Sequence, residues 1–288
     1  MILLVDSGST KTRWVSLVDG RENELVTEGL NPRLTNDNAF CRIFVKVMEW
    51  GVSGDAVEKV WFYGAGCGTR EAQTRMVRTL ANSLGIRPER VCVAGDLLGA
   101  CRATCGTSAG WVGILGTGSN LCFYDGIGIA RQRVSTGFLL GDEGSGNHIG
   151  RRLLKDYLEE RMPNNISTMF HDAYNMSADQ FINRIYCQPN PNRFLASLAT
   201  FADQHQREPY IAAVLEECFG SFFDRLDEFG GTQSHPLHLV GGITQSFSRT
   251  LEQMAALRGI TLGVMVGDPM PGLIDYHKNN NPCEKLCK

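Results

Sequence analysis

The sequence predicts an α/β protein that contains two copies of one unit, in which three strands precede alternating helices and strands (β-β-β-α-β-α-β-α). Segments 2–30 and 110–134 follow the same plan: a strand, a turn of small residues, a second strand, an Asp-Gly hairpin and a third strand. Each half then has a strand that breaks into glycines, a helix, and a strand that ends in Gly-Asp. Because these matches occur twice in the same order, the pattern favours a duplicated fold.

The elements of the first copy follow from local patterns. The apolar run "ILLVD" is typical of a buried strand, and "KTRWVSLVDG" alternates polar and apolar residues before an Asp-Gly pair, which is a strong hairpin signal. A short strand that ends in glycines leads to a helical stretch and then to the strand "RVCVAGD". The expected strands lie at 2–6, 11–20, 23–30, 59–66 and 90–96, and the helix lies at 69–85.

The second copy repeats this order and contains an additional, mostly helical section at about 145–235. We therefore expect an N-terminal domain at 1–109 and a C-terminal domain at 110–288, with the last helix open to packing on the N-terminal domain. Two α/β halves joined near residue 110 would leave a cleft between them, which is a common place for a ligand. The expected strands lie within 110–134, 237–242 and 262–268, and the helix lies at 246–259.

Composition and charge limit the function classes. The 288 residues carry a formal net charge of -3, so the basic face that sequence-independent nucleic-acid binding needs is not indicated. No apolar run approaches the roughly 20 residues that a membrane helix needs. Ten cysteines are scattered along the chain without a secretory leader, which predicts reduced thiols in a cytoplasmic protein. A homodimer is a possible assembly, since dimers are the commonest soluble oligomers.

Two turns of small, hydroxyl-bearing residues follow the first strand of each copy. "DSGSTKT" (6–12) includes Lys11, and "GTGSN" (116–120) has the matching place in the second copy. Glycines let backbone N–H groups approach a ligand, and successive N–H groups form an anion-binding concavity. One such turn alone is usually only a hairpin, but two at matching places predict a polyphosphate site. Asp6, which ends its strand before the turn, suits a carboxylate that holds Mg²⁺.

Two acidic segments have both a structural and a functional interpretation. Asp96 ends the strand "VCVAGD" and starts an expected helix, so it is either an N-cap or a carboxylate that accepts the proton of an attacking hydroxyl. Asp268 has the matching place in the second copy but precedes "PMPG", which favours a cap or a turn. The two acids of "GDEGSG" (141–146) lie either in a solvated loop or in a carboxylate fork that binds a polyol.

Four motifs occur in the order found in N-acetylglucosamine and glucosamine kinases: "DSGSTKT" (6–12), "GILGTGSN" (113–120), "GDEGSG" (141–146) and "LVGGI" (239–243). In these motifs, and over nearly its whole length, the chain resembles that branch of the BadF/BadG/BcrA/BcrD ATPase family, within the superfamily of sugar kinases, Hsp70 and actin. The resemblance implies two RNase H-like domains, the actin-like ATPase fold, around an interdomain ATP cleft. This agrees with the duplicated unit.

The resemblance also implies roles at matching positions. Asp6 is expected near Mg²⁺, and Asp96 matches the catalytic base. The nucleotide is expected to contact two phosphate loops and an adenosine motif, at Ser9, Thr10, Lys11, Thr12, Gly116, Thr117, Gly118, Ser119, Gly241 and Gly242. The positions that match sugar contacts of the relatives are Asn31, Asn120, Gly137 and Asp142.

One stretch departs from the family pattern. Relatives often carry "GWG" shortly before "GDEGS", whereas this chain has Ser135 and Thr136 where Gly-Trp would stand. A sugar ring commonly packs on an aromatic face. Either Phe138 or another aromatic side chain therefore substitutes for the tryptophan, or the preferred sugar differs.

The motifs and the resemblance together predict an ATP-dependent kinase of an amino sugar, with ATP and Mg²⁺ as cofactors. N-acetylglucosamine is the first candidate substrate, and the family implies the C6 hydroxyl as acceptor. The alternative is the ATPase activator of a radical dehydratase or reductase, in which cysteines hold an iron–sulfur cluster between subunits; Cys101, Cys105, Cys283 and Cys287 would be the candidates. A sugar-sensing repressor is a third class, but it adds a DNA-binding domain, for which a first strand at residue 2 leaves no room upstream.

Overall fold

The computed structural model describes residues 1–8, 10–32, 37–52, 54–230 and 234–280. The chain forms two compact units. Unit 1 contains Met1–Ser108, Gly126–Ile129 and the residues from Pro269 onward, and unit 2 contains Ala109–Asp125 and Ala130–Asp268. The last helix therefore belongs to the first unit, so each unit is assembled from segments that are distant in the sequence.

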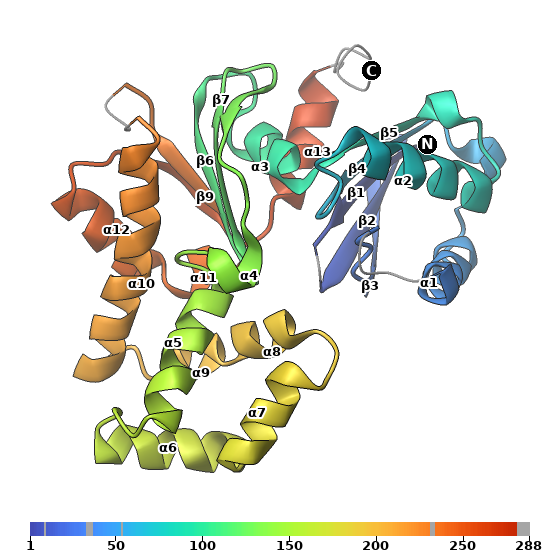
Figure 1. Cartoon of the computed structure of the whole chain (residues 1–288). Helices are drawn as coiled ribbons and strands as arrows, with labels where there is room; N and C mark the ends of the chain where they lie inside the picture. Colours follow the sequence, from blue (N-terminus) through green and yellow to red (C-terminus); the bar gives the residue numbers. More distant parts are fainter. Residues whose placement is uncertain (9, 33–36, 53, 231–233, 281–288) are drawn as a thin grey trace. The chain divides into compact units, whose positions relative to one another are not determined.

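Unit 1 is a five-stranded sheet with helices on both faces (Figure 1). Its strands are β1 (Ile2–Ser7), β2 (Lys11–Val18), β3 (Arg21–Glu28), β4 (Lys59–Gly64) and β5 (Val91–Gly95). Its helices are α1 (Asp37–Glu49), α2 (Arg70–Leu84), α3 (Asp96–Cys105) and α13 (Met270–Asn279), with short 3₁₀ helices at Gly54–Ala56 and Pro88–Arg90.

The local signals in the sequence explain where these elements begin and end. The β2–β3 hairpin turns at Asp19 and Gly20, whose φ angles of 48° and 76° are both positive, as an Asp-Gly turn requires. Helix α2 begins after Thr69, whose hydroxyl accepts the N–H of Ala72 at 3.3 Å, and ends at Gly85 in the left-handed conformation.

The strand order of unit 1 is β3-β2-β1-β4-β5. Strands β1, β2 and β3 form an antiparallel meander, whereas β4 and β5 run parallel to β1. Successive residues of β1 point to opposite faces of the sheet. Leu3 and Val5 lie in the apolar core with α1 and α2, and Leu4 lies in the second core with Leu273 of α13. Both faces of the sheet are therefore covered.

Unit 2 has a second five-stranded sheet. Its strands are β6 (Gly110–Leu115), β7 (Ser119–Tyr124), β8 (Ile129–Gln132), β9 (Leu237–Val240) and β10 (Leu262–Val266). Its helices are α4 (Gly137–Leu140), α5 (Gly146–Leu158), α6 (Asn164–Tyr174), α7 (Ala178–Tyr186), α8 (Pro191–Ser197), α9 (Ala199–Gln204), α10 (Pro209–Glu228), α11 (Gly242–Ser246) and α12 (Ser248–Leu257).

The two sheets have equivalent topology, which confirms the duplicated α/β fold. The order β10-β9-β6-β7-β8 places the first strand of the copy, β6, between a meander partner and a parallel strand, as β1 is placed in unit 1. The additional helical section consists of α5 to α10, between the third and fourth strands of this copy (Figure 1).

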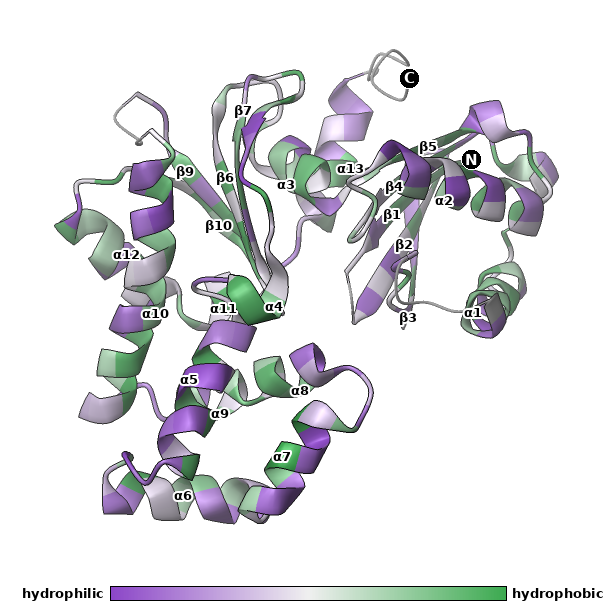
Figure 2. Ribbon diagram, viewed as in Figure 1, coloured by the Kyte–Doolittle hydropathy of each residue, from purple (hydrophilic) through white to green (hydrophobic). Residues whose placement is uncertain are grey.

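One large apolar core joins the sheet of unit 2 to its helices. It contains Leu115 of β6, Ile149 of α5 and an aromatic group that includes Phe170, Phe181 and Phe201. In Figure 2 these helices carry both hydrophobic and hydrophilic residues, as expected for helices with one buried side. In the part of the chain that the structure describes, no helix combines the length and apolar character needed to cross a membrane.

Candidate active site

The parallel strands of unit 1 bring two carboxylates to one edge of the sheet. Strand β1 pairs with β4, and β4 pairs with β5, so that Ser7, Gly64 and Gly95 are neighbours in register. Asp6 lies one residue before the end of β1, and Asp96 follows β5 as the first residue of α3. The expected metal ligand and the expected base therefore lie at the same edge.

Burial raises the pKa of both carboxyl groups. The pKa of Asp6 rises to about 7, first because the side chain is desolvated and second because Asp96 is a nearby like charge; Lys11 and Arg13 oppose this shift. Desolvation also raises the pKa of Asp96, although its Oδ1 accepts the N–H of Leu97 at 2.9 Å. Near neutral pH this edge therefore holds a proton that a divalent cation would displace.

The carboxylates at this edge fit magnesium. Among the described residues, no group of three or more His, Cys, Asp or Glu side chains could hold a metal ion. Magnesium in nucleotide sites typically uses one or two carboxylates, its own waters and the phosphates of the substrate. Asp6 supplies one such carboxylate, so this edge suits a magnesium–nucleotide complex and leaves Asp96 for another role.

The loop between β1 and β2 is anchored by two buried hydroxyl groups. Ser7 Oγ and Thr12 Oγ1 lie 2.7 Å apart and both side chains belong to residues with no exposed surface. Both oxygens accept the N–H of Leu30 at 3.0 Å, and Thr12 also donates to the carbonyl of Glu28 at 3.0 Å. The loop is thereby fixed to the segment that follows β3.

This network shows what the Thr12 side chain does in the fold. Its hydroxyl is bonded to backbone inside the unit, so it positions the loop, and the expected contact of Thr12 with the phosphates stays a prediction. Thr10 and Lys11 are exposed at the turn and keep their expected role as predictions. Ser9, also expected near the phosphates, lies outside the described residues.

Asn31 lies on the segment that this network fixes. It is buried, and its side chain packs against Gly66, in the loop after β4. Gly66 has a φ of 82°, and a Cβ there would collide with the Asn31 amide, so the close approach requires glycine. Further along the loop, Gly68 approaches Gly95, next to Asp96. The sequence patterns did not indicate that this loop contacts Asn31 and Gly95, which precedes Asp96, although its two glycines are a signal of close backbone approach.

In unit 2 the second phosphate loop, Gly116–Ser119, joins β6 to β7. The N–H of Gly116 donates to the carbonyl of Gly118 at 3.0 Å. The carbonyls of Gly116 and Thr117 accept the N–H groups of Gly146 and Asn147, at 2.9 and 3.1 Å, in the first turn of α5. These bonds fix the loop on the helix that begins within "GDEGSG".

The adenosine motif expected at Gly241 and Gly242 lies beside this loop. Gly241 follows β9, has a φ of 125°, and its N–H donates to the carbonyl of Val266 at 2.9 Å. A Cβ at Gly241 would collide with the carbonyl of Leu115, which directly precedes the second phosphate loop. The carboxyl ends of β6, β9 and β10 therefore bring both glycine motifs together, as is common for ligand sites in α/β sheets.

Asp142 is held in an unusual conformation at the turn between α4 and α5. Its φ of 60° is uncommon for a residue other than glycine, and its side chain is buried. Oδ1 accepts the N–H of Ser119 at 3.2 Å, and Oδ2 accepts the Asn147 amide at 3.3 Å. Desolvation raises the pKa of Asp142, while these two hydrogen bonds oppose the shift. A strained residue that its neighbours hold in place points to a functional position.

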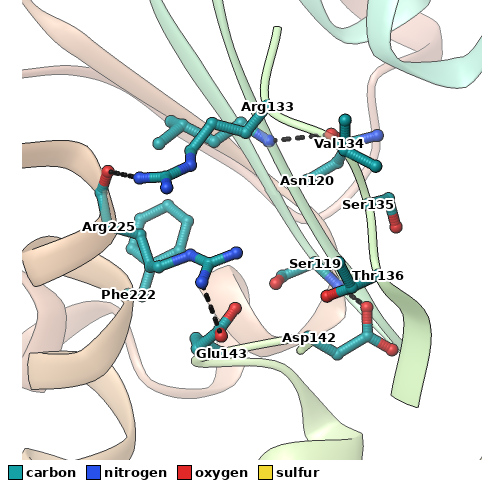
Figure 3. Close-up of a pocket in the computed structure, with 11 residues that line it drawn as sticks. Ser119, Asn120, Arg133, Val134, Ser135, Thr136, Asp142, Glu143, Phe222 and Arg225 are labelled. Carbon is teal, nitrogen blue, oxygen red and sulfur yellow. Dashed lines mark hydrogen bonds and ion pairs between the residues drawn. The ribbon is translucent and has the colours of Figure 1, made fainter. Parts of the chain in front are cut away.

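A hollow of about 30 Å³ lies beside Asp142 (Figure 3). Asn120, which matches a sugar contact of relatives, lies at this hollow, and its Oδ1 accepts the N–H of Leu121 at 3.0 Å. Gly137 begins α4, next to the lining residue Thr136. The lining consists of Ser119, Asn120, Leu121, Arg133, Val134, Ser135, Thr136, Asp142, Glu143, Phe222 and Arg225.

The lining shows where the residues at the departure from the family pattern lie. Ser135 and Thr136 line the hollow, whereas Phe138 packs against the apolar core of unit 2 and lies outside the lining. The aromatic side chain of the lining is Phe222, from α10. No sequence pattern indicated Phe222 or Arg225, because α10 reaches the hollow only through the folding of the helical section.

Comparison with solved structures places the two units in a class. The chain has the actin-like ATPase fold of the sugar kinases, and it is an ATP-dependent sugar kinase. It is 36% identical to the "putative N-acetylglucosamine kinase" of Porphyromonas gingivalis, with a TM-score of 0.88 over 97% of this chain and 99% of that one. The chain belongs to the same sugar kinase family as that protein.

Two more distant structures share the fold. The "putative N-acetylglucosamine kinase" of Chromobacterium violaceum is 18% identical, with a TM-score of 0.74 over 96% of this chain and 98% of that one. A glucokinase of the ROK family from Streptomyces griseus, in complex with glucose and AMPPNP, is 16% identical, with a TM-score of 0.54 over 96% and 98% of the two chains. No family model matches the chain, and no curated protein matches it.

Proposed function

We propose that this sugar kinase transfers the γ-phosphoryl group of ATP to the C6 hydroxyl of N-acetylglucosamine, and that it belongs to the BadF/BadG/BcrA/BcrD family. The observation that carries the proposal is the edge of unit 1 where Asp96, Asp6 and the Asn31 loop lie together. The printed name of the Porphyromonas gingivalis relative supports the choice of sugar.

Asp96 acts as the general base in this proposal. Its carboxylate accepts the proton of the sugar hydroxyl while the hydroxyl oxygen bonds to the γ-phosphorus and the bond to the β-phosphate oxygen breaks, releasing ADP. Burial raises the pKa of Asp96, which makes the ionised carboxylate a stronger base. The N–H of Leu97, 2.9 Å from Oδ1, keeps the carboxylate oriented.

Each unit by itself has loops that suit part of a nucleotide. Thr10, Lys11 and the loop Gly116–Ser119 bind the phosphates, and Gly241 and Gly242 let the adenosine lie against backbone. Asp6 would hold Mg²⁺, which would supply positive charge beside the phosphate oxygens. Asn31, Asn120 and Asp142 bind hydroxyl groups of the sugar, with Gly137 beside them.

The test is ADP release from Mg·ATP with N-acetylglucosamine, glucosamine and glucose, for the wild type and for Asp96→Asn. We expect turnover with N-acetylglucosamine and a loss of at least about 100-fold in the variant, because general-base catalysis contributes that much. Two-dimensional phosphorus–proton NMR of the product identifies the acceptor hydroxyl.

The matched control is Asp19→Asn, which makes the same change at the exposed β2–β3 hairpin. This variant should turn over at the wild-type rate. Full sugar-dependent turnover by Asp96→Asn would contradict the proposed role of Asp96, and a product phosphorylated at another oxygen would contradict the choice of C6.

The alternative function, an ATPase activator with an iron–sulfur cluster, makes a different prediction. Cys101 and Cys105 are both buried in α3, within a single chain, whereas a bridging cluster needs thiolates at a subunit interface. Cys283 and Cys287 lie outside the described residues. ATP hydrolysis that is indifferent to every sugar, together with iron in protein purified without oxygen, would favour the activator.

A further inference from the structure

Two guanidinium groups form one wall of the hollow beside Asp142 (Figure 3). Arg225 extends from α10, one turn after Phe222, whose ring lies behind it in the close-up. Arg133 enters from the segment that follows β8 and reaches across toward α10. The wall is therefore cationic and rests on a buried aromatic ring.

Hydrogen bonds and ion pairs hold both guanidinium groups in place. Arg225 Nη1 lies 3.3 Å from Glu143 Oε1. Arg133 Nη1 donates to the carbonyl of Arg225 at 3.2 Å and to Glu228 Oε2 at 2.9 Å. Within the described part of the chain, Glu143 engages one end of the Arg225 guanidinium. The other N–H groups can donate to an acceptor in the hollow, since 31% of the Arg225 side chain is exposed.

The carboxylates of the hollow are already engaged by protein donors. Glu143 pairs with Arg225, and Asp142 accepts hydrogen bonds from Ser119 and Asn147. Glu143 is engaged by the guanidinium, so an ammonium group that enters beside Arg225 meets a like charge at this wall. The hollow therefore favours a neutral group with an acceptor oxygen over an ammonium group.

The opposite wall offers hydroxyl groups instead of an aromatic face. Figure 3 shows that Ser135 and Thr136 line this side of the hollow. In the sequence, these two residues stand at the departure from the family pattern. Recognition on this side therefore depends on hydrogen bonds and charge more than on stacking. The hollow, with a volume of about 30 Å³, has room for a group of the size of a water molecule or a methyl group.

We propose that Arg225 is a specificity-determining residue that selects N-acylated amino sugars against the corresponding free amines. The carbonyl oxygen of the acyl group accepts a hydrogen bond from the guanidinium, and the methyl group fills the hollow against Phe222. A protonated sugar amine at the same place meets a like charge and has no acceptor to offer. The inference rests on the proposed sugar kinase function and extends it to the recognition of the acyl group on the sugar nitrogen.

The experiment compares kcat/KM for N-acetylglucosamine and for glucosamine at neutral pH. The proteins are the wild type, Arg225→Met, Arg225→Lys and the double variant Arg225→Met with Glu143→Gln, which also removes the carboxylate that the first change leaves unpaired. We expect the ratio of the two kcat/KM values to favour N-acetylglucosamine in the wild type and to fall by about tenfold in the double variant, because a charged hydrogen bond and a charge repulsion are both lost. Arg225→Lys keeps the charge and should keep most of the rejection of glucosamine.

The control is Arg258→Met, which removes the ion pairs of Arg258 with Asp224 and Asp227. These two acids lie on α10, as Arg225 does, but they do not line the hollow. The ratio should stay at the wild-type value. An unchanged ratio in the double variant, with N-acetylglucosamine still phosphorylated, would overturn the role of Arg225 and leave the kinase proposal standing. A wild type that phosphorylates no sugar would overturn both. If the double variant does not fold, Arg225→Lys decides, because a ratio about tenfold below that of the wild type would contradict selection by charge.

Discussion

The two neighbouring carboxylates of unit 1, Asp6 and Asp96, lower the stability of the protein when no ligand is bound. Asp6 and Asp96 both lose water on folding, which raises the pKa of each carboxyl group, and the like charge of Asp96 raises the pKa of Asp6 further. The two carboxylates lie at the same edge because the register of β1, β4 and β5 aligns the ends of these strands. Such a cost is typical of a site whose stability is recovered when a cation binds.

The pH dependence of stability should reveal this cost at Asp6. The pKa of Asp6 is raised from 3.8 to about 7, so the native state binds the proton more tightly than the unfolded chain. The free energy of unfolding therefore falls as pH rises through that window, and Asp6→Asn removes the fall. With a chelator present, the variant should be more stable than the wild type by roughly 1–3 kcal/mol at pH 8, with a smaller difference at pH 5.

Urea unfolding at the two pH values measures this difference. Asp19→Asn, at the exposed hairpin, should follow the wild type at both. A constant gap between Asp6→Asn and the wild type from pH 5 to pH 8 would show that the Asp6 carboxyl group titrates normally in the folded protein.

At the scale of elements, loops are positioned by bonds that point into the protein and not toward a ligand. The hydroxyl groups of Ser7 and Thr12 tie the β1–β2 loop to Leu30, and the first turn of α5 ties the Gly116–Ser119 loop. In both units a glycine-rich turn owes its shape to a neighbouring element. Changes in the anchoring element should therefore alter binding without touching a substrate.

Replacing Thr12 by valine tests this idea. The change keeps the shape of the side chain but removes one of two hydroxyl donors to the carbonyl of Glu28 and one of two acceptors of the Leu30 N–H. We expect a loss of about 1–3 kcal/mol in the free energy of unfolding, and a higher KM for the sugar, because Asn31 follows Leu30 directly. Urea unfolding and steady-state kinetics measure the two effects.

The exposed neighbour Thr10 supplies the control for stability. Thr10→Val should leave the free energy of unfolding within about 0.5 kcal/mol of the wild type, as is usual for surface positions. If Thr12→Val loses stability but binds the sugar with an unchanged KM, the hydroxyl network supports the fold alone and does not position Asn31.

The sequence predicted the elements better than it predicted their contacts. Strands, hairpins and the duplicated order depend on local patterns, so alternation, Asp-Gly pairs and terminal glycines were sufficient to find them. Asp6 and Asp96 could also be paired in advance, because parallel strands end at the same edge. Thr12 points inward and Arg225 lines the hollow because of contacts between residues that are distant in the sequence. Such contacts leave no periodic pattern in a single sequence.

At the scale of the whole molecule, the last helix of the chain, α13, belongs to unit 1. Helix α13 packs on α3, where a Cβ at Gly272 would collide with the carbonyl of Ala103. Arg102 of α3 donates to the Tyr63 hydroxyl at 2.6 Å, and that hydroxyl lies 2.9 Å from His277 Nε2 of α13. Desolvation, with the nearby Arg102, lowers the pKa of His277 to about 3, so the ring is neutral in this contact. The last helix is therefore part of the structure that carries Asp96.

This arrangement predicts that a core change in α13 weakens the first unit rather than the second. Leu273 has no exposed surface and packs with Leu4 and Trp61 of the unit 1 sheet. Leu273→Ala should lower the free energy of unfolding by about 2–5 kcal/mol, and Asp275→Ala, on the exposed side of the same helix, should change it little. Because unit 1 contains this helix, amide hydrogen exchange in Leu273→Ala should quicken in β1, β4 and β5, although these strands lie more than 170 residues earlier in the chain. Faster exchange confined to β9 and β10, which are the strands nearest in sequence, would instead show that the last helix folds with the second unit.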